Sequence, residues 1–164
     1  MKMNSDYANK LCKKLVEEEK SILNYESTAR TYSHAPSEKP TVLAYSFQET
    51  EAKLREVRGK IAGLKHAINK FNTSTVLESY GITIDQALCQ MSIMHNDKKR
   101  LAEMCQIPEV ARSREYGSKE PDITHRNFGI DEVQARYDEL CEDLMKLQQA
   151  INIANLTIEF DVDI

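Results

Sequence analysis

The sequence predicts an all-α fold of four long antiparallel helices, arranged as two helical hairpins with heptad packing and a short β element at the C-terminal tail. Only five Gly, four Pro and no Trp are present, while Leu, Lys, Glu, Gln and Ala abound, which favours helix. In four separate segments the apolar residues also recur at steps of three and four. At 164 residues and 18.8 kDa, we expect residues 1–164 to form a single helical-bundle or coiled-coil domain.

The first two helices are expected to form one hairpin. The first runs from about Ser5 to Tyr32, and the prolines that follow it remove donors and restrict their neighbours, so residues 31–41 form a turn. The second begins near Ser46, whose hydroxyl can cap it while Glu49 reaches back, and ends near Phe71. Its inward stripe consists of Leu54, Val57, Ile61, Leu64, Ile68 and Phe71.

A polar turn leads into the third helix. Residues 75–77 and 80–82 predict either a short hairpin or an extended connection, and Thr83 with Gln86 three residues later reads as a capping box. The helix then runs from about Ile84 to Gln106. The following segment, 109–129, has no helical period, leaves room for two short strands, and is the longest irregular stretch in the chain.

The fourth helix starts near Asp131, and a period-two strand pattern follows at 157–164. A lone strand leaves its backbone groups unpaired, so we expect it to pair with residues 75–77 or with a second copy of the chain. An isolated hairpin would expose the apolar seam of this helix, which predicts a homo-oligomer. The seam consists of Val133, Tyr137, Leu140, Leu144, Leu147, Ile151 and Ala154.

Charge and cysteine spacing exclude several classes of protein. The net charge of −4 argues against general nucleic-acid binding, although the second helix carries a basic face. The cysteines form no C-x-x-C pair, which predicts reduced thiols. The N-terminus lacks an apolar h-region, and no run of about 18 apolar residues occurs, so we expect a cytoplasmic protein without a membrane partner. The cysteines are Cys12, Cys89, Cys105 and Cys141.

No catalytic motif is present. The sequence lacks H-E-x-x-H, G-x-S-x-G, the phosphate-binding G-x-x-x-x-G-K-[ST] and a glycine fingerprint after a strand. The four histidines lie in separate segments and no two have the i, i+4 spacing that puts two ligands on one helical face. We therefore expect no enzyme activity, no cofactor and no metal site.

Segment 109–129 holds the best constellation for an anion. Arginine donates two parallel hydrogen bonds to phosphate, and a tyrosine can stack on a base, so a nucleotide would satisfy both. The alternative is a solvated loop whose arginines pair with Glu109, Glu115 and Asp122. The candidate ligand-binding residues are Arg112, Arg114, Tyr116, His125, Arg126 and Asn127.

A second constellation would gather amides and hydroxyls at one end of an up-down bundle, where they can grip a polar ligand. The alternative is that Asn and Thr at helix ends satisfy the backbone groups of the turn. The candidates are Lys65, Asn69, Asn72, Thr73 and Thr75, with Asn152 and Asn155.

Three stretches carry a family resemblance: LKHAINKFNTST at 64–75, TIDQAL at 83–88 and QQAINIANLT at 148–157. With them, the chain resembles an uncharacterised bacterial family labelled septicolysin-like. The resemblance covers most of the chain and implies a long-helix, coiled-coil-like fold with no established catalytic residues. The chain departs from the family at 128–131, where FGID stands in place of a Thr-Val-Asp type start to the last helix.

Three functions are compatible with these observations. The first is a non-catalytic oligomer that binds and sequesters a small anionic molecule, such as a nucleotide signal, between chains. The second is a structural or adaptor coiled coil that binds another protein. The third is an RNA-contacting helical arm that uses the basic face of the second helix.

Overall fold

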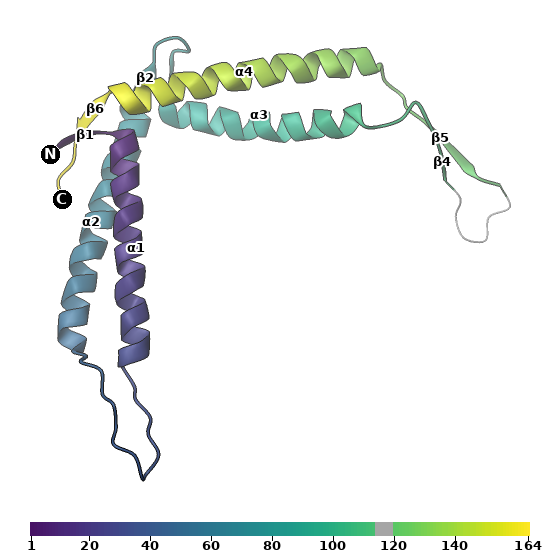
Figure 1. Ribbon diagram of the computed structural model, residues 1–164. Coiled ribbons are helices and arrows are strands. Elements are labelled where there is room, and N and C mark those ends of the chain that lie inside the picture. Colours follow the sequence, from purple (N-terminus) through teal and green to yellow (C-terminus); the bar gives the residue numbers. More distant parts are fainter. Residues whose placement is uncertain (114–119) are drawn as a thin grey trace. The chain divides into compact units, whose positions relative to one another are not determined.

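The computed structural model describes residues 1–113 and 120–164, and these are mostly helical (Figure 1). They divide into two compact units. The terminal unit combines Met1–Val76 with Ile153–Ile164, and the central unit is Leu77–Asn152. Four helices and several short strands, one of them at the C-terminal tail, are found in the described chain, as the sequence predicts.

In the terminal unit, α1 (Ser5–Ala29) and α2 (Phe47–Ser74) pack side by side in opposite directions (Figure 1). Ser46 caps α2, because its hydroxyl accepts a hydrogen bond from the Glu49 amide. The stripe predicted on α2 is buried along its whole length. Helix α1 ends at Ala29, short of the predicted end near Tyr32, and both Tyr25 and Tyr32 are exposed.

The termini complete this unit. Strand β1 (Lys2–Asn4) pairs antiparallel with β6 (Glu159–Asp161), so that Met3 lies opposite Phe160. The Met1 amino group donates to the Val162 carbonyl at 2.9 Å, and the Val162 amide donates to the Met1 carbonyl at 2.8 Å. The expected pairing of the C-terminal strand with residues 75–77 is therefore wrong, because the N-terminus supplies the edge.

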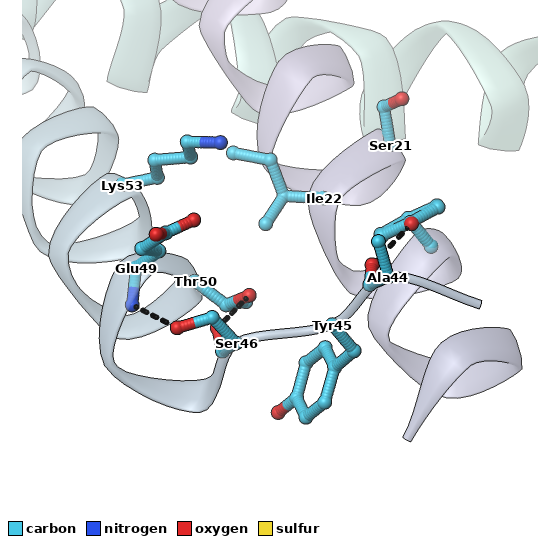
Figure 2. Close-up of a pocket in the computed structure, with 9 residues that line it drawn as sticks. Ser21, Ile22, Ala44, Tyr45, Ser46, Glu49, Thr50 and Lys53 are labelled. Carbon is cyan, nitrogen blue, oxygen red and sulfur yellow. Dashed lines mark hydrogen bonds between the residues drawn. The ribbon is translucent and has the colours of Figure 1, made fainter. Parts of the chain in front are cut away.

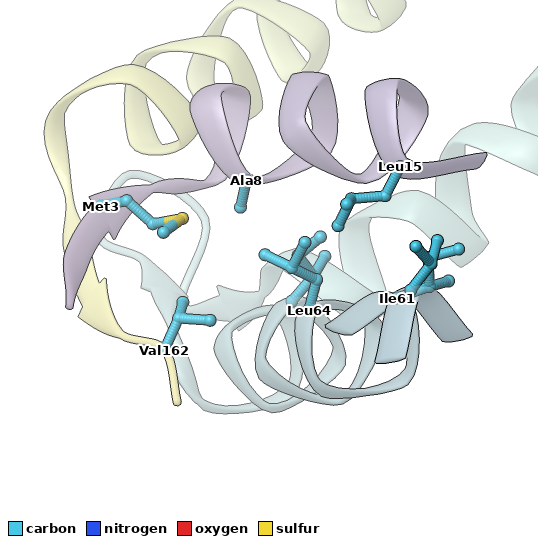
Figure 3. Close-up of a cluster of buried hydrophobic side chains, with 8 residues drawn as sticks. Met3, Ala8, Leu15, Ile61, Leu64 and Val162 are labelled. Carbon is cyan, nitrogen blue, oxygen red and sulfur yellow. The ribbon is translucent and has the colours of Figure 1, made fainter. Parts of the chain in front are cut away.

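The best-enclosed core lies where the two terminal strands cover the helical hairpin (Figure 3). Leu64 of α2 is fully buried there and Val162 is 1% exposed. Phe160 of β6 stacks on Phe71 of α2 with ring centroids 4.7 Å apart. The strands add a third layer at this end only, which explains why the loop end of α1 keeps its tyrosines in solvent. The cluster comprises Met3, Ala8, Leu15, Val57, Ile61, Leu64, Ile68 and Val162.

After α2, β2 (Val76–Leu77) pairs with β3 (Ile82–Thr83), and Gly81 between them has φ +65°, a conformation that favours glycine. The predicted capping box is present at the start of α3 (Ile84–Cys105). The Gln86 amide donates to the Thr83 hydroxyl at 3.2 Å, and the Thr83 amide donates to the Gln86 side-chain oxygen at 2.9 Å. Strands β4 (Val110–Ser113) and β5 (Asp122–His125) follow.

Helix α4 (Ile130–Thr157) begins in the central unit and ends in the terminal unit. Its predicted apolar seam is not exposed: apart from the half-buried Tyr137, every seam residue is at most 8% exposed. The inference of an oligomer from an open seam between Val133 and Ala154 is therefore wrong, since a single chain already covers these side chains. Within the central unit, the Lys98 ammonium of α3 lies 5.9 Å from the centre of the Tyr137 ring.

The close approach of the C-terminal residues to α2 generates the first prediction. A Cβ at Gly63 would lie 3.1 Å from both the Asp163 carbonyl oxygen and an Ile164 methyl carbon, whereas a Cβ at Gly59 would meet nothing within 4 Å. Gly63→Ala should leave the protein at least about 1 kcal/mol less stable than Gly59→Ala does, because overpacking against the C-terminal residues offsets the gain in helix propensity. Gly59→Ala, in the same helix, should raise the free energy of unfolding by about 0.5–1 kcal/mol. Urea unfolding of both variants measures this, and equal stabilisation by the two would contradict the contact.

Candidate functional site

The predicted anion constellation lies on and beside the β4–β5 hairpin. Its register places Arg112 opposite Ile123 and Val110 opposite His125. Directly opposed residues share a face of an antiparallel pair, and so do residues two apart on one strand. These four side chains therefore occupy one face, with Arg112 and His125 on one diagonal and Val110 and Ile123 on the other.

All four side chains of this face are exposed, Val110 at 47% and Ile123 at 52%. Diagonal neighbours in a sheet have Cα atoms about 7–8 Å apart, a distance that a long arginine side chain can span. Arg112 and His125 can thus contact one anionic group together. The face offers two donors for an anion beside two apolar side chains.

Arg126 makes contacts within the chain that the sequence does not predict. Its amide donates to the Glu109 carbonyl at 2.9 Å, and its guanidinium donates to the Ile107 carbonyl at 3.2 Å. The guanidinium also lies 5.7 Å from the centre of the Phe128 ring. These contacts hold together the two ends of the hairpin. Asn127 is exposed beside it, and Arg114 and Tyr116 lie outside the described residues.

The second constellation serves mainly the end of α2. The Thr73 hydroxyl donates to the Asn69 carbonyl at 3.0 Å and to the Lys70 carbonyl at 3.1 Å. The Thr75 amide donates to the Phe71 carbonyl, which closes the helix. The structure thus favours the helix-end interpretation for the Thr73 side chain. Lys65 and Asn69 have exposed side chains, and Asn72 is half-buried.

The two asparagines that were grouped with this constellation lie in different units. Asn152 belongs to the central unit, where its side-chain oxygen accepts from Gln148 at 2.9 Å. Asn155 belongs to the terminal unit, and its side-chain oxygen is buried without a hydrogen-bond partner among the described residues.

A cavity of about 490 Å³ at the loop end of α1 and α2 was not predicted (Figure 2). The Tyr25 hydroxyl donates to the Ala44 carbonyl at 2.5 Å, and the Thr50 hydroxyl donates to the Ser46 carbonyl at 2.9 Å. Linker residues 44–46 form part of the wall, and no sequence period marks them, so helical patterns alone cannot reveal this cavity. It is lined by Ser21, Ile22, Tyr25, Ala44, Tyr45, Ser46, Glu49, Thr50 and Lys53.

The basic face of α2 is partly neutralised within the chain. Arg58 pairs with Glu19 of α1 at 2.6 Å, and this hydrogen bond raises the pKa of Arg58. Lys60 pairs with Glu56 at 2.6 Å, which raises the pKa of Lys60 and lowers that of Glu56. Since two of its cations already have acidic partners, the face is a weaker site for RNA phosphates than the sequence suggests.

Residues 1–113 and 120–164 show neither a cluster of metal-ligating side chains nor a helix that could cross a membrane. No group of three or more His, Cys, Asp or Glu side chains there is placed to hold a metal ion. None of the helices formed by these residues combines the length and the apolar character that a bilayer crossing requires.

Tyr45, in the wall of the cavity, generates a prediction about pH. Its hydroxyl donates to the Glu26 carboxylate at 2.7 Å, and this hydrogen bond, followed by desolvation, raises the Tyr45 pKa above 10.0. A pKa raised in the folded state contributes stability that is present below pH 10 and lost as the pH rises further. The stability advantage of the wild type over Tyr45→Phe should therefore be constant from pH 7 to 9 and shrink above pH 10. Urea unfolding at pH 8 and 10.5 tests this, and a pH-independent difference would contradict it.

Comparison with known proteins indicates the fold. No protein-family model matches the chain, and no curated protein matches it. The chain is similar to a solved structure described as a functionally unknown conserved protein from Corynebacterium diphtheriae, with a TM-score of 0.69 and 16% sequence identity. The alignment covers 98% of this chain and 100% of that one. At this identity the similarity shows a shared fold alone.

Proposed function

We propose that the protein is a non-catalytic, self-associating binding protein that sequesters a small anionic molecule on its β4–β5 hairpin. The observation that carries this proposal is the exposed diagonal of Arg112 and His125 between Val110 and Ile123. Binding of this kind requires no catalytic acid or base. It also suits a cytoplasmic protein, which we take this one to be.

The hairpin face suits a phosphate-bearing ligand with an apolar part. The Arg112 guanidinium can donate two parallel hydrogen bonds to a phosphate, and His125 can add a third. Val110 and Ile123 would then contact a base or a ribose. A nucleotide combines these parts, so we propose a nucleotide as the ligand.

One hairpin face cannot enclose such a ligand. Binding sites for small molecules usually bury most of the ligand surface, whereas these four side chains are open to solvent. We propose that a second copy of the chain covers the bound molecule. Arg126, which braces the two ends of the hairpin, would keep the face in position for both copies.

Exposed apolar side chains on α3 and α4 support self-association, because such side chains gain free energy when a partner covers them. We also propose that α3 and α4 pack within the chain with coiled-coil heptad geometry, in line with the septicolysin-like resemblance.

The groove between α3 and α4 is the proposed self-association face. It has a volume of about 310 Å³, and Met145, which is 68% exposed, lies on its wall. An apolar side chain this exposed gains free energy when a partner covers it. The groove is lined by Met91, His95, Lys98, Cys141, Leu144, Met145 and Gln148.

Ligand binding can be tested by calorimetric titration with ADP. Arg112→Ala and His125→Ala should each weaken binding at least about tenfold, since each removes a charge-assisted donor. Thr124→Ala, on the opposite face of the same hairpin, is the control and should bind like the wild type. Unchanged ADP affinity in both variants would contradict the assignment of Arg112 and His125 as ligand-binding residues. If native mass spectrometry finds no molecule bound to the purified protein, and the protein binds neither ADP nor pyrophosphate, the adaptor function is favoured.

Self-association can be tested by light scattering after size exclusion. Met145→Asp should shift the mass of the wild-type assembly towards that of one chain, because a carboxylate in a covered apolar groove is costly to desolvate. Ile93→Asp is the matched control, since Ile93 is also exposed on α3 and does not line the groove. A wild type that is monomeric at 100 µM, or an assembly that both variants leave intact, would contradict this interface.

A further inference from the structure

The cavity at the loop end of α1 and α2 carries two opposite charges without ion-pair partners. Glu49 and Lys53 both line it, and neither forms an ion pair within the described residues. In Figure 2 the Lys53 side chain extends from α2 towards Ile22 of α1, and the Glu49 carboxylate lies between Lys53 and Thr50. The cavity thus offers one carboxylate and one ammonium group to an occupant.

Glu49 and Lys53 are both exposed and form no ion pair with each other in the described chain, although their spacing allows one. An acid followed four residues later by lysine is the favoured order for an ion pair along a helix. Three acid–lysine pairs with this order and spacing close in the described chain, at 2.7 Å for Asp6–Lys10, 2.6 Å for Glu56–Lys60 and 3.4 Å for Glu142–Lys146, whereas the acid–arginine pair Glu51–Arg55 on α2 is open there. Glu49 and Lys53 have the same geometry on α2 and remain apart. Both groups are therefore available to bind another molecule.

The hydroxyls around the cavity are used by the protein itself. Ser46 accepts from the Glu49 amide, Thr50 donates to the Ser46 carbonyl, and Tyr25 donates to the Ala44 carbonyl. These bonds fix the start of α2 and the linker that forms the wall. Two apolar surfaces remain, the side chain of Ile22 and the Tyr25 ring. The hydroxyls of the wall are thus occupied within the protein, and Glu49 and Lys53 are the charged side chains that line the cavity.

We infer that this cavity binds a small zwitterion, an α-amino acid with an apolar side chain. Its ammonium group would donate to the Glu49 carboxylate, and its carboxylate would accept from the Lys53 ammonium. Its side chain would lie against Ile22 and Tyr25. The volume of about 490 Å³ is within the range of small-molecule sites. The site is separate from the anion site proposed on the β4–β5 hairpin, and neither depends on the other.

The test uses the full chain and three probes that differ in charge. L-phenylalanine carries both charges, its methyl ester only the cation, and N-acetyl-L-phenylalanine only the anion. Titration of ¹⁵N-labelled protein should shift the amide signals of residues 46–53 with L-phenylalanine, and each single-charge probe should bind at least about tenfold more weakly. Glu49→Gln and Lys53→Gln should each weaken L-phenylalanine binding by a similar factor.

Glu51→Gln and Arg55→Gln are the matched controls. They lie on the same helix with the same spacing but outside the cavity, so both should leave L-phenylalanine binding unchanged. Equal binding of the zwitterion and either single-charge probe would overturn the zwitterion assignment. No shift in residues 46–53 at 10 mM L-phenylalanine, or equal loss in the control variants, would overturn the site. Neither result would affect the ADP titration, which reports on a different part of the chain.

Discussion

The pairing of β1 with β6 is the interaction on which the terminal unit depends. Two helices alone leave one side of each apolar stripe open, because a helical hairpin has only two layers. The paired ends of the chain supply the third layer at one end of α1 and α2, where Leu64 and Val162 become inaccessible. Where this layer is absent, at the loop end, tyrosines are exposed and a cavity is present.

Helices and caps were predictable because their signals are local. The capping box at Thr83 and the N-cap at Ser46 each need only a side chain and a backbone amide a few residues away. The partner of β6 was not predictable, since a period-two pattern specifies which face is buried but not which edge is available. Gly63 likewise looks like an ordinary helical glycine until the C-terminal residues are placed beside it.

The candidate sites, too, are predicted in part by local sequence signals and in part only by the folded structure. Composition pointed to the 109–129 segment, and the two predicted strands form there, but only the register shows that Arg112 and His125 share a face. Arg126 has the same chemistry as Arg112, yet it binds backbone carbonyls next to the hairpin, a role that depends on folded geometry. The cavity that contains Glu49 and Lys53 needs a wall from the proline-containing linker, and no periodic pattern encodes that wall.

The terminal unit is built from two separate stretches of the chain, 1–76 and 153–164, and this sets the order in which the two units can fold during synthesis. A ribosome releases residues 77–152 before residues 153–164, so the central unit has all of its sequence while the α1–α2 hairpin still lacks β6 and Val162. During that interval Met3 and Leu64 remain partly open to solvent. Closing the unit joins segments about 160 residues apart, a contact that is slow to form. A nascent chain would thus expose part of the apolar surface of the α1–α2 hairpin until β6 is synthesised. In this interval a chaperone or a second copy of the chain would find the largest apolar surface to bind.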